Sequence, residues 1–246
     1  MKRWLTFVFV LALAVALGGV FSRVPRALAE VEAFRVTEVR LRGTRFLTQE
    51  EAERVLDLSP AASVWDDTKV LDARLEEHPL VREATIHRRF PGALLLEVVE
   101  REPVALFPNP CLEPVDEAGR TLPIDPALHK LDLPIMAATG GSGPGSLTPS
   151  ELRLLAGEIF RLAEGDPEFH SRISDFALNP RGEVRARIMD SSVTLRFRPG
   201  LSSGRIDTGM KVLEDAQARF GEGEVVDLDL RFDDQVVVRF GWAGGS

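Results

Sequence analysis

Residues 78–105 read HPLVREATIHRRFPGALLLEVVEREPVA, and this stretch decides the fold of the N-terminal half. Ala84 and Ile86 alternate with polar neighbours, which is the pattern of a strand with one buried face. A turn signal, Phe-Pro-Gly, follows at 90–92, and alternate apolar residues at 94–98 form one face of a return strand. The stretch therefore predicts a β-hairpin.

The residues before the hairpin predict one strand and two helices. A half-buried strand is expected at 34–42, where charged residues separate the apolar ones. Thr48 followed by Glu51 forms a capping box, which predicts a short helix. A second helix starts at Asp66 or Asp67. The predicted order is strand, helix, helix, strand, strand.

The residues after the hairpin predict a second, strand-rich unit. Residues 116–119 (DEAG) form a tight turn, and 139–146 (TGGSGPGS) have the composition of a flexible segment. A capping box starts a helix at Thr148, and a second amphipathic helix ends near Phe220. Strands are expected at 173–178, 183–188, 193–198, 225–232 and 236–240. We therefore predict an α+β protein whose second unit is an antiparallel β domain with two helices.

The first residues carry the signal of a membrane segment. Residues 4–21 contain no charge over a length of roughly 18 residues, close to the minimum needed to span a bilayer as a helix. That length favours a retained anchor over a signal peptide, although Ala27-Leu28-Ala29 has the form of a cleavage site. Basic residues flank both ends of the run, so its orientation is left open.

Composition and motifs argue against catalysis and against nucleic-acid binding. The net charge is -8, and phosphate-backbone binding requires a concentrated excess of basic residues. The single cysteine, Cys111, excludes an intramolecular disulfide, and the four histidines lack metal-ligand spacing. Residues 140–144 only superficially resemble a nucleophile elbow, and no nucleotide-binding glycine pattern occurs. We expect no cofactor, no metal and no small-molecule substrate.

Two surface features suggest binding to other molecules. A basic cluster on the hairpin could contact lipid headgroups, an acidic partner or only solvent; it comprises Arg82, His87, Arg88 and Arg89. The last strand contains three consecutive valines, so both of its faces are apolar. Such a strand lies either at a sheet edge, where it accepts an added strand, or in the centre of a core.

The 78–105 stretch resembles the end of the POTRA domain found in the FtsQ/DivIB family of bacterial cell-division proteins. That family shows the pattern P-x-V-x-x-A-x-V-x-R-x-x-P-x-x-L-x-I-x-V-x-E-R-x-P-x-A, preceded by a strand like 36–43. Further similarities are the VDxxG turn at 115–119, the Leu-Pro element at 133–134 and the closing DLRY-like strand at 226–232. The resemblance extends from the apolar run to Phe240.

The resemblance implies a single-pass inner-membrane protein of the division septum that is not an enzyme. It would have a short cytoplasmic N-terminus and a periplasmic C-terminal part, and would link early and late division proteins while regulating septal peptidoglycan synthesis. The implied segments are a cytoplasmic tail 1–3, a transmembrane helix 4–21, a linker 22–33, a POTRA domain 34–102, a β domain 103–240 and a flexible tail 241–246.

The resemblance also implies partners and a site. FtsB-like and FtsL-like single-pass coiled-coil proteins would bind by strand addition at the last strand. The implied partner-binding residues are Arg231, Phe232, Asp234, Val236, Val238 and Phe240. Phe232 stands where the family has tyrosine, and the cytoplasmic tail is very short. Two alternatives remain open: a POTRA-bearing envelope-assembly or secretion module, and a secreted enzyme released at Ala29.

Overall fold

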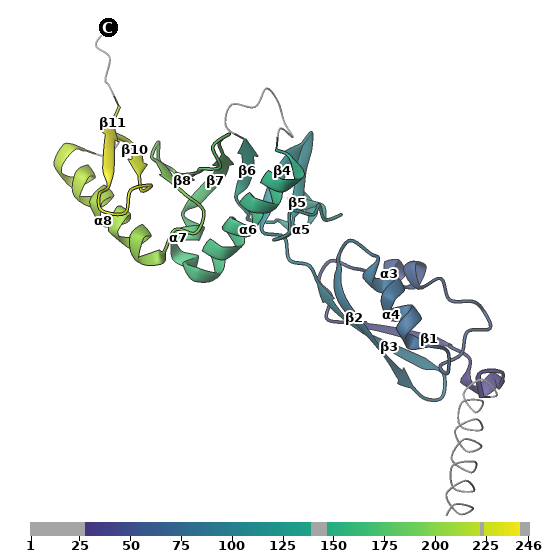
Figure 1. Cartoon of the computed structure of the whole chain (residues 1–246). Helices are drawn as coiled ribbons and strands as arrows, with labels where there is room; N and C mark the ends of the chain where they lie inside the picture. Colours follow the sequence, from purple (N-terminus) through teal and green to yellow (C-terminus); the bar gives the residue numbers. More distant parts are fainter. Residues whose placement is uncertain (1–27, 139–146, 222–223, 242–246) are drawn as a thin grey trace, which may run out of the picture. The chain divides into compact units, whose positions relative to one another are not determined.

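The computed structural model describes residues 28–138, 147–221 and 224–241 of the chain (Figure 1). The chain divides into two compact units, Met1–Arg101 and Glu102–Ser246. The apolar run 4–21, the glycine-rich segment 139–146 and the tail 242–246 lie outside the described residues. In the described ranges, no helix has the length and apolarity to cross a membrane.

The first unit is a three-stranded sheet with two helices. Its element order is η1 (Glu32–Phe34), β1 (Glu38–Arg42), α3 (Gln49–Leu56), α4 (Thr68–Glu76), β2 (Val81–Arg89) and β3 (Ala93–Glu100). The strand order is β1-β3-β2, with β1 parallel and β2 antiparallel to β3. The predicted element order is confirmed, but the first strand begins at Glu38 and not at Phe34, because a 3-10 turn occupies residues 32–34.

Local chemistry sets where these helices begin. At α3, Thr48 and Glu51 form both halves of the predicted capping box, and the Asp67 side chain caps α4 by accepting from the amide of Lys69. The helices bury Leu56 and Leu75, which are fully covered. Burying a leucine in this way contributes roughly 1.5–3 kcal/mol per side chain.

Helix α4 also closes one edge of this sheet. The Asp72 carboxylate accepts a hydrogen bond from the Ile86 amide at 2.8 Å, and the Glu76 carboxylate accepts one from the Ala84 amide at 3.3 Å. Both amides belong to β2, an outer strand. Because two edge donors are already satisfied by side chains, β2 is a poor template for an added strand.

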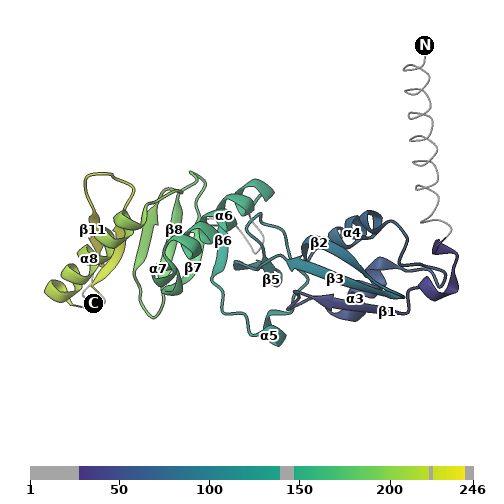
Figure 2. The same ribbon diagram turned by 90° about the horizontal axis from the view of Figure 1, so that it is seen from below.

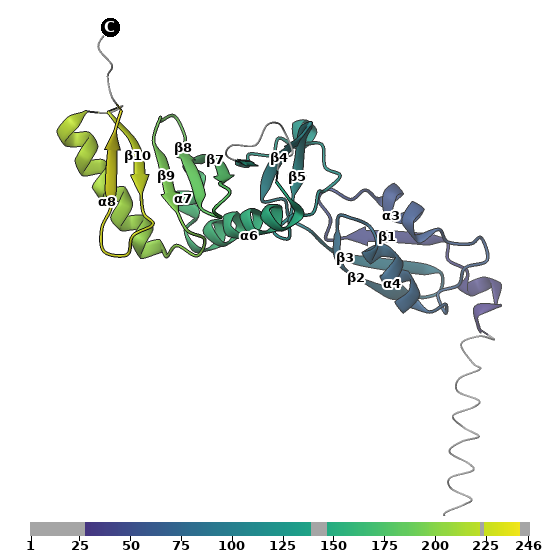
Figure 3. The ribbon, with the colours of Figure 1, turned by 45° about the horizontal axis from the view of Figure 1, so that its top comes forward.

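The second unit contains one eight-stranded sheet. Its strands are β4 (Ala105–Asn109), β5 (Cys111–Val115), β6 (Ile135–Ala138), β7 (Ile173–Leu178), β8 (Val184–Ile188), β9 (Thr194–Phe197), β10 (Val225–Asp229) and β11 (Val237–Phe240). The helices are α5 (Pro126–His129), α6 (Pro149–Gly165), α7 (Pro167–Ser171) and α8 (Ser203–Phe220). The strand order is β11-β10-β9-β8-β7-β6-β4-β5 (Figure 3).

The prediction of an antiparallel β domain was wrong, because this sheet is mixed. Three neighbouring pairs are parallel: β4 with β6, β6 with β7, and β9 with β10. The two long helices explain two of these pairs, since α6 lies between β6 and β7 in the chain and α8 lies between β9 and β10. A helical crossover returns the chain to the same end of the sheet, so the next strand runs parallel. The short helices α5 and α7 were not predicted.

One face of the large sheet holds the core. Helices α6, α7 and α8 lie in a row along the sheet (Figure 2). They bury apolar residues together with alternate residues of the strands, including Phe176, Leu195 and Leu228. The opposite positions on the same strands are charged, for example Asp175, Arg185 and Arg196. The sheet therefore has one apolar, helix-covered face and one polar face.

Candidate interaction site at the C-terminal strand

Strand β11 is one of the two outer strands of the large sheet. Among the described strands it pairs with β10 alone, in the antiparallel direction, with Leu228 opposite Val238 and Asp229 opposite Val237. The sequence left open whether this strand lies at the edge or in the centre of its sheet, and in the structure it lies at the edge. The free side of an edge strand presents backbone amides and carbonyls to which another strand can bind.

The apolar side chains of β11 point to both faces, as the three valines indicated. Val236 and Val238 are half-buried and pack on the core, on the same face as Leu228. Val237 is also half-buried and lies on the polar face opposite Asp229. The strand is therefore held to its own sheet by apolar contacts, while its outer edge pairs with no strand of the described residues.

Exposed aromatic rings lie at the end of β11. Phe240 is 47% exposed, and its ring meets that of Phe220 from α8 edge-on, with centroids 4.8 Å apart. Phe220 is 59% exposed, so the pair forms an apolar patch on the surface. The sequence indicated Phe220 only as part of an amphipathic helix, and its contact with Phe240 was not predicted because it joins residues distant in the chain.

The loop between β10 and β11 carries the other predicted residues. Phe232 is 42% exposed, and the Arg231 guanidinium lies 6.0 Å from the centre of its ring. Asp234 is exposed in the turn. The Arg205 side chain on α8 donates hydrogen bonds to the backbone carbonyls of Phe232, at 2.6 Å, and Gln235. Arg205, which sequence reasoning missed, thus fixes the loop on its helix.

Arg231 is bound within its own domain. Its guanidinium donates two hydrogen bonds to the Asp229 carboxylate, at 2.8 and 2.5 Å. It donates a third, at 2.7 Å, to the carboxylate of Glu183, the residue directly before β8. The hydrogen bond to Asp229, followed by that to Glu183, raises the pKa of Arg231 above its ordinary value. The same contacts lower the pKa values of Asp229 and Glu183. Only 19% of the Arg231 side chain is exposed.

A basic hollow lies on the polar face beside these residues. It has a volume of about 580 Å³, and the lining side chains include five arginines: Arg181, Arg185, Arg196, Arg231 and Arg239. Arg196 is paired with Asp227 at 2.5 Å, whereas Arg181, Arg185 and Arg239 form no ion pair within the described chain. The alternating arginines of 181–198 were the sequence signal for this hollow, and we did not predict it. Its chemistry suits carboxylates.

The described residues contain no group of three histidine, cysteine or acidic side chains placed to hold a metal ion. Cys111 is exposed and unpaired. The features that the structure brings together are a free strand edge, exposed aromatic rings and a basic hollow. These are the features of a surface that binds another polypeptide.

The fold and this surface define a class of protein: a POTRA-type module followed by a mixed-sheet domain with a free edge strand. Residues 34–101 match the model of the POTRA domain, FtsQ-type. The chain is 30% identical to the cell division protein FtsQ of Anaeromyxobacter sp. (strain K) over 243 residues, which cover 94% of this chain and 79% of the relative. The chain belongs to the FtsQ family of cell division proteins.

Other relatives agree with this assignment. The cell division protein FtsQ of Myxococcus fulvus is 27% identical over 206 residues, covering 80% of this chain and 70% of that protein. The FtsQ of Bradyrhizobium diazoefficiens is 32% identical over 95 residues, covering 38% and 25% of the two chains. The predicted family and its POTRA module are therefore confirmed.

Proposed function

We propose that this protein is a non-catalytic scaffold of bacterial cell division that binds partner chains at the edge of β11. Family membership supports the role in division. The observation that carries the proposed site is the position of β11 as an outer strand, with half-buried valines holding its inner side. Backbone hydrogen bonds along the free edge would give affinity, and side-chain contacts would give specificity.

The side chains around β11 support a partner with a particular chemistry. An added strand would continue the sheet beyond Val238, and an adjoining segment with acidic side chains would meet the unpaired Arg185 and Arg239. Phe240 and Phe232 would be covered by apolar side chains of the same partner. FtsB-like and FtsL-like single-pass coiled-coil proteins are the proposed partners, and through them the chain would regulate septal peptidoglycan synthesis.

The apolar run and the family resemblance support a proposed location. We propose that residues 4–21 form a single inner-membrane anchor, with residues 1–3 in the cytoplasm and both folded units in the periplasm at the septum. Residues 22–33 would link the anchor to a POTRA domain at 34–102, followed by the β domain 103–240 and a tail 241–246. A balanced set of flanking basic residues leaves the orientation to be tested directly.

Photo-cross-linking in cells tests the proposed site. A photoreactive amino acid would be placed at 232, 234 or 240, and captured proteins would be identified by mass spectrometry. The matched control is position 154, because Leu154 on α6 and Phe232 are both 42% exposed. We expect capture of a small single-pass coiled-coil protein at the three test positions and not at 154. Equal capture at 154, or capture of barrel-assembly proteins alone, would contradict the proposal.

Substitution of Phe240 tests the energetic role of its ring. Buried aromatic anchors of interfaces lose about 2 kcal/mol or more on truncation, so Phe240→Ala should weaken partner binding about 30-fold. Because Phe240 contacts Phe220 in the free protein, the fold of the variant must be checked by chemical denaturation. Leu154→Ala is the control of similar exposure. Unchanged binding by Phe240→Ala would show that the site is wrong.

A further inference from the structure

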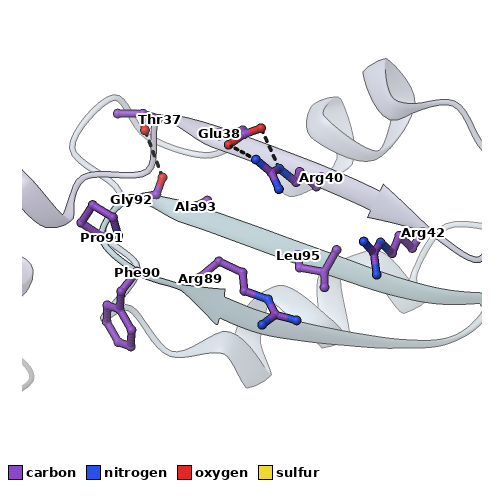
Figure 4. A pocket seen from close by; sticks show the side chains of 10 residues that line it. All are labelled: Thr37, Glu38, Arg40, Arg42, Arg89, Phe90, Pro91, Gly92, Ala93 and Leu95. Carbon is purple, nitrogen blue, oxygen red and sulfur yellow. Dashed lines mark hydrogen bonds and ion pairs between the residues drawn. The ribbon is translucent and has the colours of Figure 1, made fainter.

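The POTRA-type unit has a second surface that partner binding at β11 does not use. Helices α3 and α4 cover one face of its sheet, and alternate strand residues point to the other, open face. That face contains a hollow of about 460 Å³ (Figure 4). Arg40 and Arg42 of β1 and Arg89 of β2 line the hollow, with Leu95 of β3 between them.

Two of the three arginines that line the hollow form no ion pair in the part of the chain that the structure describes. Arg40 is paired with Glu38 at 2.7 Å. Arg42 and Arg89 are exposed, and neither forms an ion pair or a hydrogen bond through its side chain within the described residues. They are therefore available to an external anion.

The helical side of the same unit has the opposite charge. The segment 49–77, which forms α3, α4 and their connection, contains nine acidic and three basic residues. On the open face, Glu97 lies opposite Arg42 and is paired with His87, so the basic part of that face is the hollow itself, whereas the helical layer is acidic. A negatively charged surface would attract the arginines of the hollow and repel the acidic helical layer, which would turn the hollow toward that surface.

An aromatic cluster adjoins the basic hollow. Phe90, which lines the hollow, is 55% exposed. Its ring centre lies 5.1 Å from that of Trp65 and 6.1 Å from that of Phe34. Exposed aromatic rings beside arginines are the side chains that partition into the headgroup region of a bilayer, where the rings enter the interface and the guanidinium groups meet phosphates.

We infer that this face docks on an anionic lipid surface, with Arg42 and Arg89 at the phosphates and Phe90 in the interface. The inference rests on the proposed membrane anchor at 4–21. Phe34 is 13 residues beyond the end of that run, a fully extended reach of at most about 45 Å. A tether of this length keeps the unit at a high effective concentration near the membrane, so weak docking is enough.

The experiment uses the full chain in vesicles of neutral phosphatidylcholine, with or without about a third anionic phosphatidylglycerol. A photoreactive amino acid replaces Phe90, and lipid adducts are measured by mass spectrometry. The control is position 70, because Val70 on α4 is 54% exposed against 55% for Phe90. We expect lipid adducts at 90 at least fivefold above those at 70 in anionic vesicles, falling with added salt. Equal yields at 90 and 70, or no dependence on anionic lipid, would overturn the inference.

Charge variants separate the arginines from the ring. Arg42→Gln with Arg89→Gln should reduce the adduct yield at 90 at least fivefold, since each basic residue near an anionic surface adds to its attraction. The matched control removes two charges from the helices, Arg54→Gln with Lys69→Gln, and should leave the yield unchanged or raise it. An equal fall in both double variants would contradict a specific role for the open face.

Three further outcomes distinguish this inference from the proposed function. If an alkaline wash releases the chain from the vesicles, the anchor is wrong, and if adducts at 90 are also missing, lipid docking is wrong as well. If the chain is retained without adducts at 90, docking alone is wrong. If position 90 captures an acidic protein in cells and no lipid, the face binds that protein and the inference is wrong. Capture of a partner at 240 reports on β11 independently of all three.

Discussion

At the scale of single residues, Arg231 shows how a residue implied in binding also holds the fold. Its guanidinium joins Asp229, which is 1% exposed, to Glu183. A family resemblance marks the position but does not show which partner the side chain takes. The structure gives it two carboxylates of its own domain, so a loss of partner binding on substitution would not by itself place Arg231 in the interface.

Substitution of Arg231 should therefore destabilise the second unit. Arg231→Met leaves the buried Asp229 carboxylate without its ion pair, which should lower the free energy of unfolding by about 2 kcal/mol or more. Urea denaturation of the full chain measures this. The control is Arg198→Gln, because Arg198 is exposed and forms no ion pair in the described residues. Equal stability of the Arg231→Met variant and the parent would disprove the structural role.

The same contacts predict an acid-dependent loss of stability. The pKa values of Asp229 and Glu183 are lowered in the folded protein, chiefly by hydrogen bonds from Arg231. Carboxylates with lowered pKa values stabilise the fold above their ordinary values, 3.8 and 4.5, and that contribution is lost as the pH falls through the folded values.

The difference in unfolding free energy between the parent and Arg231→Met should therefore shrink below about pH 4, where unfolded carboxylates become protonated. Urea denaturation at a series of pH values between 7 and 3 provides the measurement. Taking the difference removes the effect of the other carboxylates, which titrate in both proteins. A difference that stays constant down to pH 3 would show that Arg231 does not control these two pKa values.

At the scale of elements, α8 supports the strands that carry the proposed interaction site. Gly209 lies on the face of α8 that meets β10, where an added Cβ would come within 2.7 Å of the Leu230 side chain. Arg205 of the same helix holds the loop before β11. Helix α8 therefore supports both β10, which the glycine allows it to approach closely, and the loop that leads into β11.

Enlarging Gly209 should separate α8 from β10. Gly209→Val forces overpacking against Leu230 and should cost about 1–3 kcal/mol of stability, with weaker partner capture at position 240. Gly204→Ala is the matched control in the same helix, because nothing lies within 4 Å of its added Cβ. The control should be neutral or slightly stabilising. The denaturation midpoints of the two variants are compared. If Gly209→Val and Gly204→Ala have similar midpoints, the close approach of α8 to β10 is not required for stability.

The elements also show what the sequence could and could not predict. Capping boxes at Thr48 and Thr148 located the starts of α3 and α6, because the cap involves residues only three apart. The order of strands in the large sheet was not predictable in this way, since parallel pairs such as β9 and β10 depend on where a helix returns the chain. The contacts of Phe220 and Arg205 were missed for the same reason: both join distant parts of the chain.

At the scale of the whole molecule, the chain contains two units with separate cores. Leu96 is fully buried in the first unit, and Phe176 in the second. The first unit ends at Arg101 and the second begins at the next residue, Glu102. The proposed tasks are divided in the same way, with lipid contact assigned to the first unit and partner binding to the second.

Separate cores predict separate unfolding. Leu96→Ala should destabilise the first unit by roughly 2–5 kcal/mol, because it leaves a cavity under α3 and α4. Hydrogen exchange followed by mass spectrometry should then show faster exchange in β1, β2 and β3, while protection of β10 and partner capture at position 240 remain at parental levels. The reciprocal variant, Phe176→Ala, should expose β7 to β10 and leave β3 protected. Loss of protection in both units from either substitution would show that they fold as one cooperative body, and a defect in one task could then no longer be assigned to one unit.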